Sequence, residues 1–291
     1  MRRLIVGCGY LGQRVARAWL DAGDDVTALT RSEGNADRLS RMGVEPIVGD
    51  VLLPDTLSRL PVADTLLYAV ARGRRSDVSQ RTLYVEGLSN VLRATRSRVS
   101  RLIYISSTSV YGQSEGEWVD EESACEPVRE NGKACLEAEA VVWKFFPSDQ
   151  ATSGTGANVL RLAGIYGPGR LTRRIDALRS AESVLDDPDA FINLIHIDDA
   201  VGAVLACEKR GRPGTTYLVS DGNPILKREF YGLMADRLGA PEPTFSTDSK
   251  GSPEQFGKCC SNARLRDELM TELRFPTAEA GLAHALAEEN E

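Results

Sequence analysis

The start of the chain carries the pattern that most restricts its fold. An apolar run at residues 4–6 ends at Gly7, and the pattern Gly7-x-Gly9-x-x-Gly12 leads into a helix-like segment that reaches Leu20. A strand, a glycine turn and a helix in this order are typical of a dinucleotide-binding site. Gly7 permits the sharp turn, Gly9 lets the backbone approach a pyrophosphate, and Gly12 lets the helix pack closely on the strand.

The helix after this turn favours a phosphate ligand. Its N-terminus offers N–H groups without intrahelical partners, together with the positive end of the helix dipole. The pattern therefore predicts a dinucleotide site, and the alternative is a glycine turn that serves packing alone. The residues expected to surround the pyrophosphate are Gly7, Gly9, Tyr10, Leu11 and Gly12.

Short apolar runs alternate with amphipathic segments along the rest of the chain. Strands are expected at residues 26–29, 46–48, 65–70, 101–105, 158–162, 191–197 and 216–219, and helices near 35–42, 77–95, 129–145, 198–205, 227–238, 261–270 and 277–287. This alternation predicts an α/β fold with a doubly wound parallel sheet.

The end of the second predicted strand bears on the choice of cofactor. An NAD site usually carries an acid there, about 20 residues beyond the glycine turn, to bond the ribose 2′-hydroxyl. Thr30 and Arg31 stand at that place instead. Arg31 can hold a 2′-phosphate through charge-assisted hydrogen bonds, and Ser32 can add another. We therefore expect NADP, with NAD as the alternative if Arg31 is only a surface residue.

Further cofactor contacts are expected where the later strands end, because ligands of open parallel sheets bind at the carboxyl ends of the strands. Asp50 follows the third strand and is a candidate for the adenine edge, or a cap for the next turn. Small residues follow the fourth strand. The cofactor residues expected beyond the glycine turn are Arg31, Ser32, Asp50, Val51, Ala69, Val70, Ala71 and Ser106.

Charge and composition exclude several classes of partner. The formal charge is −7 with acids and bases mixed, which argues against nucleic acid, and the basic run at residues 72–75 is interpreted as a solvated loop or a phosphate contact. The six cysteines form no CxxC pair and there are two histidines, so no metal site is expected. His196 lies in an apolar strand and is expected to be structural. Scattered cysteines, an early first strand and no long apolar run predict a cytoplasmic protein without a signal peptide or membrane span.

Several segments together resemble the extended short-chain dehydrogenase/reductase family, also called the NAD-dependent epimerase/dehydratase family. They are the glycine turn, Asp50, ISSTSVYG (105–112), RLAGIYGPGR (161–170) and NLIHIDD (193–199). The resemblance implies a Rossmann domain at 1–166, to which 191–221 returns, and a smaller substrate lobe at 167–190 and 222–291. It also implies a homodimer, with helices near Leu88 and Leu136 in contact.

The resemblance further implies a catalytic Ser or Thr, a Tyr and a Lys. Ser107 matches the first, which hydrogen-bonds the substrate oxygen. Lys133, followed four residues later by Glu137, matches the Lys, which lowers the Tyr pKa and holds the nicotinamide ribose. The proton-relaying Tyr should lie four residues before the Lys, and Arg129 stands there. A guanidinium stays protonated and cannot relay a proton, although it can stabilise an anion.

The sequence thus predicts an atypical family member. The leading hypothesis is an NADP-dependent oxidoreductase or epimerase-like enzyme acting on a small polar or sugar-derived substrate, with Arg129 in place of the Tyr. Thr108 and Ser109 stand where dehydratases have acids, which disfavours sugar-nucleotide dehydration. A noncatalytic NADP(H)-binding sensor or scaffold is the second hypothesis. An S-adenosylmethionine methyltransferase also uses a glycine turn, but the missing acid after the second strand weighs against it.

Overall fold

The structure, a computed structural model, describes residues 1–73, 78–150, 155–185, 187–246 and 256–287, so Arg74 and Arg75 of the basic run lie outside it. The chain divides into two compact units. Unit 1 comprises Met1–Tyr111, Cys125–Arg161 and Ala203–Tyr217, and unit 2 comprises Gly112–Ala124, Leu162–Gly202 and Leu218–Glu291. We describe each unit by itself.

A parallel sheet forms the centre of unit 1 and confirms the predicted doubly wound α/β fold. Among the described residues it has seven strands in the order β12-β7-β5-β4-β1-β2-β3. The strands are β1 (Arg2–Val6), β2 (Asp25–Thr30), β3 (Glu45–Val48), β4 (Ala63–Tyr68), β5 (Val99–Ser107), β7 (Gly156–Leu162) and β12 (Thr215–Val219). The helices that accompany it are α1 (Tyr10–Asp21), α2 (Glu33–Arg41), α3 (Gly87–Ala94), α4 (Glu130–Phe145) and α6 (Ile197–Arg210).

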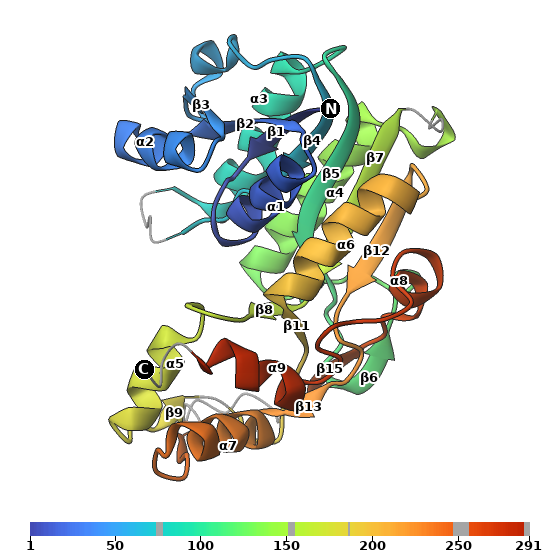
Figure 1. Cartoon of the computed structure of the whole chain (residues 1–291). Coiled ribbons are helices and arrows are strands. Elements are labelled where there is room, and N and C mark those ends of the chain that lie inside the picture. The colour runs from blue at the N-terminus through green and yellow to red at the C-terminus, as the bar shows by residue number, and fades with distance from the viewer. Residues whose placement is uncertain (74–77, 151–154, 186, 247–255, 288–291) are drawn as a thin grey trace. The chain divides into compact units, whose positions relative to one another are not determined.

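Helices cover both faces of this sheet, with α1 on one face and α3 and α4 on the other (Figure 1). Strands that are covered on both faces are expected to be continuously apolar, and the central strands follow this rule. Leu4 and Ile5 of β1 and Leu66 and Leu67 of β4 are fully buried. The seven residues of β7 are buried as well.

The register of the strands gathers their carboxyl ends at one edge. Val6 of β1 pairs with Leu29 of β2 and with Tyr68 of β4. Tyr68 in turn pairs with Tyr104 of β5. The residues that follow β1, β2, β4 and β5 therefore meet at the same edge of the sheet. The predicted cofactor and substrate residues come from these segments.

Two predicted elements are divided in the structure. The strand expected at 191–197 is split into β10 (Phe191–Ile192) and β11 (Leu194–His196), and α6 begins at Ile197. The side chain of Asn193 explains the break, because its amide donates to the carbonyl of Lys258 and its oxygen accepts the N–H of Cys260, each over 2.7 Å. The helix expected at 77–95 contains a π-helical turn at Thr82–Glu86 before α3.

Unit 2 is built from short two-stranded sheets and helices. Its remaining strands are β6 (Glu115–Val119), β8 (Gly164–Tyr166), β9 (Val184–Leu185), β13 (Ile225–Leu226), β14 (Phe245–Ser246) and β15 (Gly257–Cys260). Its remaining helices are α5 (Thr172–Arg179), α7 (Lys227–Leu238), α8 (Ala263–Glu268) and α9 (Ala278–Ala285). Buried residues such as Tyr166, Ile175, Phe230, Met234 and Leu282 form its core.

The units differ from the domain boundaries that the sequence suggests. Residues 112–124 belong to unit 2 because β6 pairs in parallel with β15. Residues 162–166 belong there too, since β8 pairs with β11. Leu88, near which the resemblance places a dimer contact, is fully buried in the core of unit 1, so its side chain is not at the surface. None of the described helices is both long enough and apolar enough to cross a membrane.

Candidate functional site

The glycine turn after β1 has the conformation that its sequence predicts. Gly7 has a φ of +97°, which other residues rarely adopt, and a Cβ there would lie 2.4 Å from the carbonyl carbon of Ala69. A Cβ at Gly12 would lie 2.7 Å from the carbonyl oxygen of Gly7. Two of the three glycines are therefore required by the close approach of the backbone.

Gly9 differs from the other two glycines because no described atom lies within 4 Å of the place that its Cβ would take. No side chain caps the N-terminus of α1, and its first turn contains no acidic residue. The first intrahelical bond runs from the N–H of Gln13 to the carbonyl of Gly9, so the N–H groups of Leu11 and Gly12 have no intrahelical partner. Open space beside uncapped N–H groups fits a pyrophosphate.

Two basic residues follow β2, Arg31 directly after the strand and Arg38 within α2. Arg31 is exposed, and Ser32 begins α2 without a side-chain cap. Burial raises the pKa of the Cys8 thiol in the glycine turn to about 11, while the charge of Arg38 opposes this. Arg38 also donates a 2.6 Å hydrogen bond to Asn35. Sequence reasoning missed Arg38, which lies within α2, seven residues after Arg31.

Asp50 orders the turn after β3, as the capping alternative predicts. Its carboxylate accepts the N–H of Leu52 over 2.9 Å, and its N–H donates to the hydroxyl of Thr56. Val51 is buried. The adenine contact at Asp50 stays a prediction. The residues after β4 are partly or fully exposed at the edge of the sheet: Ala69, Val70 and Ala71.

A buried ion pair lies beneath the end of β5. The carboxylate of Glu139 on α4 accepts hydrogen bonds from the guanidinium of Arg161 on β7, the shortest over 2.8 Å, and from the hydroxyl of Ser106 over 2.5 Å. Arg161 also donates to the phenol of Tyr111. Burial opposes the charge of Arg161, but the bonds to Glu139 raise its pKa above the ordinary value. The Ser106 side chain is therefore engaged in this network, and a cofactor contact there would come from its backbone.

Ser107 ends β5 and starts a short turn. Its hydroxyl oxygen accepts the N–H of Ser109 over 3.1 Å, which begins the 3-10 helix Thr108–Val110. A hydroxyl that accepts one bond still carries a hydrogen to donate. Ser107 thus retains the donor that its predicted role at a substrate oxygen requires.

Arg129 precedes α4 as its N-cap residue, and Lys133 lies on an exposed face of this helix. Arg129 is exposed and its side chain caps nothing. The ammonium of Lys133 pairs with Glu130 over 2.9 Å and half of its side chain is exposed. Glu137 pairs with the exposed Arg81. Lys133 and Glu137 are four residues apart and share one face of α4, and both are exposed. In the part of the chain that the structure describes, Lys133 bonds Glu130 and Ser107 bonds Ser109, so the predicted roles of Arg129 and Lys133 at Ser107 stay predictions.

The inward face of α4 carries Asn131, Cys135 and Glu139 instead. The Asn131 amide donates to the Ser109 hydroxyl over 3.1 Å, and that hydroxyl lies 3.9 Å from the Cys135 sulfur. Gly132 fixes this orientation, because a Cβ there would lie 2.1 Å from the carbonyl oxygen of Ser109. Sequence reasoning missed this face, although Asn131, Cys135 and Glu139 are four residues apart, which is the spacing of one helix face. Burial raises the pKa of Cys135 to about 11, so the thiol is not ionised at neutral pH.

Comparison with known proteins agrees with this architecture. The sequence pattern of the NAD dependent epimerase/dehydratase family matches residues 4–220. Protein YeeZ of Escherichia coli (strain K12) is 30% identical over 282 residues, which cover 94% of this chain and 95% of YeeZ. The 2-alkyl-3-oxoalkanoate reductase of Stenotrophomonas maltophilia (strain K279a) is 29% identical over 287 residues, covering 90% of this chain and 84% of the reductase.

A solved structure shows the same fold at lower identity. It is a DesIV double mutant, a dTDP-glucose 4,6-dehydratase from Streptomyces venezuelae with NAD and DAU bound. The identity is 21%, the TM-score is 0.84, and the match covers 100% of this chain and 97% of that one.

Proposed function

Because this chain belongs to the NAD-dependent epimerase/dehydratase family, we propose that it is an NADP-dependent oxidoreductase or epimerase-like enzyme acting on a small polar or sugar-derived substrate. The observation that carries the proposal is the open, uncapped helix end at Gly9, which suits a pyrophosphate. When bound, the nicotinamide supplies or accepts a hydride. The preference for NADP rests on the guanidinium of Arg31 after β2, with Arg38 as a second cation.

Ser107 is the substrate-facing residue of this proposal. It stands at the carboxyl edge of the sheet with a hydroxyl hydrogen to donate to a carbonyl or hydroxyl oxygen. The roles of Arg129, in place of the Tyr, and of Lys133 stay predictions, and both side chains are exposed. The cytoplasmic location and the homodimer also stay predictions.

A noncatalytic NADP(H)-binding sensor or scaffold is the second candidate. The inward face of α4 favours it, because it offers the Asn131 amide and a buried Cys135 thiol to the turn at Ser109. Neither group exchanges protons readily at neutral pH. An enzyme with this face would need a proton donor from the substrate, from water or from another part of the chain.

Hydride transfer from deuterated NADPH to a panel of ketones and sugar nucleotides separates the two candidates. An enzyme is expected to place deuterium in one substrate class, and Ser107→Ala is expected to lower kcat more than NADPH affinity, since the hydroxyl bonds the substrate. Tight NADPH binding with no deuterium transfer to any panel member, in wild type and in Arg129→Tyr alike, would favour the sensor.

Arg31→Ala is expected to weaken NADPH binding by about 10- to 100-fold and to leave NADH binding unchanged, because a charge-assisted bond to the 2′-phosphate is lost. Fluorescence titration with each cofactor measures this. The matched control is Arg41→Ala, which removes an exposed guanidinium that donates to the backbone carbonyl of Asp37 in its own helix. Equal affinity of the Arg31 variant and wild type for NADPH would refute this account of cofactor choice.

A further inference from the structure

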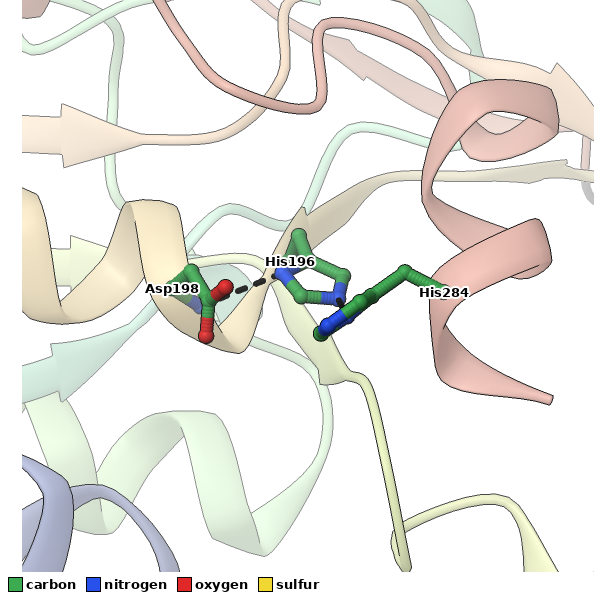
Figure 2. Close-up of side chains that lie close together, drawn as sticks. All are labelled: His196, Asp198 and His284. Carbon is green, nitrogen blue, oxygen red and sulfur yellow. Dashed lines mark hydrogen bonds between the residues drawn. The ribbon is translucent and has the colours of Figure 1, made fainter. Parts of the chain in front are cut away.

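The two histidines of the chain meet in unit 2. His196 ends β11 and is fully buried, whereas His284 lies on α9 and is partly buried. The Nε2 atom of His196 and the Nδ1 atom of His284 are 3.2 Å apart, a hydrogen-bond distance (Figure 2). Two imidazoles that are 88 residues apart in sequence are thus joined directly.

The neighbouring backbone determines which nitrogen of each ring carries hydrogen. The N–H of Asp198 donates to Nδ1 of His196 over 3.1 Å, so this nitrogen is an acceptor. The hydrogen of a neutral His196 ring is then on Nε2, which faces His284. Nδ1 of His284 must accept it, which places the hydrogen of His284 on its own Nε2. The geometry defines one arrangement, with both rings neutral.

The first turn of α6 also binds the segment that precedes α9. The carboxylate of Asp199 accepts the N–H groups of Arg274 and Phe275 over 2.7 and 2.9 Å. The guanidinium of Arg274 pairs with Asp198 over 2.9 Å. The Phe275 ring lies 4.0 Å from the His196 ring, measured between centroids. The first turn of α6 therefore anchors the segment that leads into α9.

Within α9, the His284 contact is accompanied by close packing. A Cβ at Gly281 would lie 1.9 Å from the phenol oxygen of Tyr166, so α9 sits directly on that ring. The phenol donates to the carbonyl of Thr277, which caps the helix. Of these contacts, the His196–His284 hydrogen bond is the one that a change near neutral pH can remove.

A metal ion is the rival occupant of this cluster. The ligand atoms of His196, Asp198 and His284 lie within 4.8 Å of one another. A metal on Nε2 of His196 would move the ring hydrogen to Nδ1, where it would face the N–H of Asp198. The Asp198 carboxylate is also engaged by Arg274. The His196–His284 hydrogen bond leaves Nδ1 of His196 free to accept the N–H of Asp198. A metal on Nε2 would instead place two N–H donors, those of Asp198 and His196, against each other.

We propose that the His196–His284 pair is a proton-sensitive latch, which holds α9 against the start of α6 and releases it in mild acid. A proton on Nδ1 of His284 would set two N–H groups against each other. A proton on Nδ1 of His196 would face the N–H of Asp198. The first proton breaks the bond to α9, whereas the second breaks only the bond between Asp198 and His196. An imidazole that has left this pair makes neither bond and takes up a proton without this cost. Acid therefore favours the detached helix.

Other charged groups lie near the two histidines, and their own titration has to be separated from that of the histidine pair. Asp198 and Asp199 are already bonded to Arg274 and to two backbone N–H groups, and burial raises the pKa of Asp199. Burial raises the pKa of Asp221, close to Asp199 and Tyr166, to about 7. An acid whose pKa is raised in the native state makes that state more stable as the pH falls. The latch has the opposite effect, because protonation of the histidine pair makes the native state less stable. A variant without the imidazole pair separates the two.

Amide hydrogen exchange of the full chain tests the latch. Between about pH 7.5 and 5.5, the protection of α9 relative to α7 is expected to fall about tenfold in wild type, the cost of one hydrogen bond. In His284→Gln the ratio is expected to be low at both pH values, without a step. Asp221→Asn is the control and is expected to keep the step. A wild-type ratio that does not change with pH would overturn the proposal.

Nitrogen-15 NMR of the imidazoles provides a second measurement that does not depend on the variant's stability. The chain has two histidines, so the spectrum of His284→Gln assigns both rings. Both are expected as the neutral form protonated on Nε2 at pH 7.5. A hydrogen on Nδ1 of His196, or a zinc titration that shifts both rings at one ion per chain, would show a different arrangement and overturn the latch.

Discussion

Glu139→Ala is expected to lower the free energy of unfolding by about 3–5 kcal/mol, because it leaves the buried Arg161 guanidinium without its carboxylate. The two side chains are 3% and 9% exposed. The same substitution removes the acceptor of the Ser106 hydroxyl at the end of β5. Urea denaturation of the variant and of wild type measures the loss.

The neighbouring Glu137 is the matched control. It lies on the same helix, half exposed, and pairs with an Arg81 side chain that is 61% exposed. Exposed pairs of this kind contribute about 0–1 kcal/mol, so Glu137→Ala is expected to remain within that range. Joint replacement of Glu139 and Arg161 by Leu and Met is expected to recover part of the loss, because no buried charge remains unpaired. Similar values for the Glu137 and Glu139 variants would show that the buried pair is not a major support of unit 1.

Gly9→Ala is expected to lower cofactor affinity, whereas Gly7→Ala is expected to lower the stability of the fold. Gly9→Ala is expected to fold normally and to bind NADPH about 10- to 100-fold more weakly, since its Cβ would enter the open space where we propose that the pyrophosphate binds. Gly7→Ala is expected to lose about 2–5 kcal/mol of unfolding free energy, because it combines a φ of +97° with a Cβ 2.4 Å from Ala69.

Thermal unfolding and cofactor titration of both variants make the comparison. Together the two variants show whether the glycine turn binds a cofactor or serves packing alone, which the sequence pattern leaves open. A Gly9 variant that is as stable as wild type and binds NADPH equally well would indicate that the turn serves packing alone. A stable Gly7 variant would contradict the backbone geometry after β1.

The sequence predicts elements best where the signal is local. The strand, glycine turn and helix at the N-terminus are present as predicted, because each depends on a short apolar run and on glycine geometry. The predicted helix 227–238 coincides with α7, and Gly239 ends it with a φ of +60°, a common helix stop. Ser107 and Arg31 are likewise placed by the strands that precede them.

Contacts between distant segments account for the differences. Asn193 interrupts an apolar run that otherwise predicts one strand, because its partners are in β15, more than sixty residues away. His196 seemed a core histidine by its neighbours, and its buried position fits that expectation, but its bond to His284 depends on where α9 packs. Neither the β15 partners of Asn193 nor the α9 partner of His196 lies close enough in sequence to be found from a local pattern.

The α4 helix shows where the sequence reaches its limit. The 3.6-residue period determines that Lys133 and Glu137 share one face and that Asn131, Cys135 and Glu139 share another. Both faces carry charge, so the period does not determine which one is buried. Tertiary structure decided this through Gly132, whose missing side chain admits the Ser109 carbonyl, and through Arg161, which draws Glu139 inward. The sequence alone determined the Rossmann-like α/β framework, and packing between segments distant in sequence decided which face of α4 is buried.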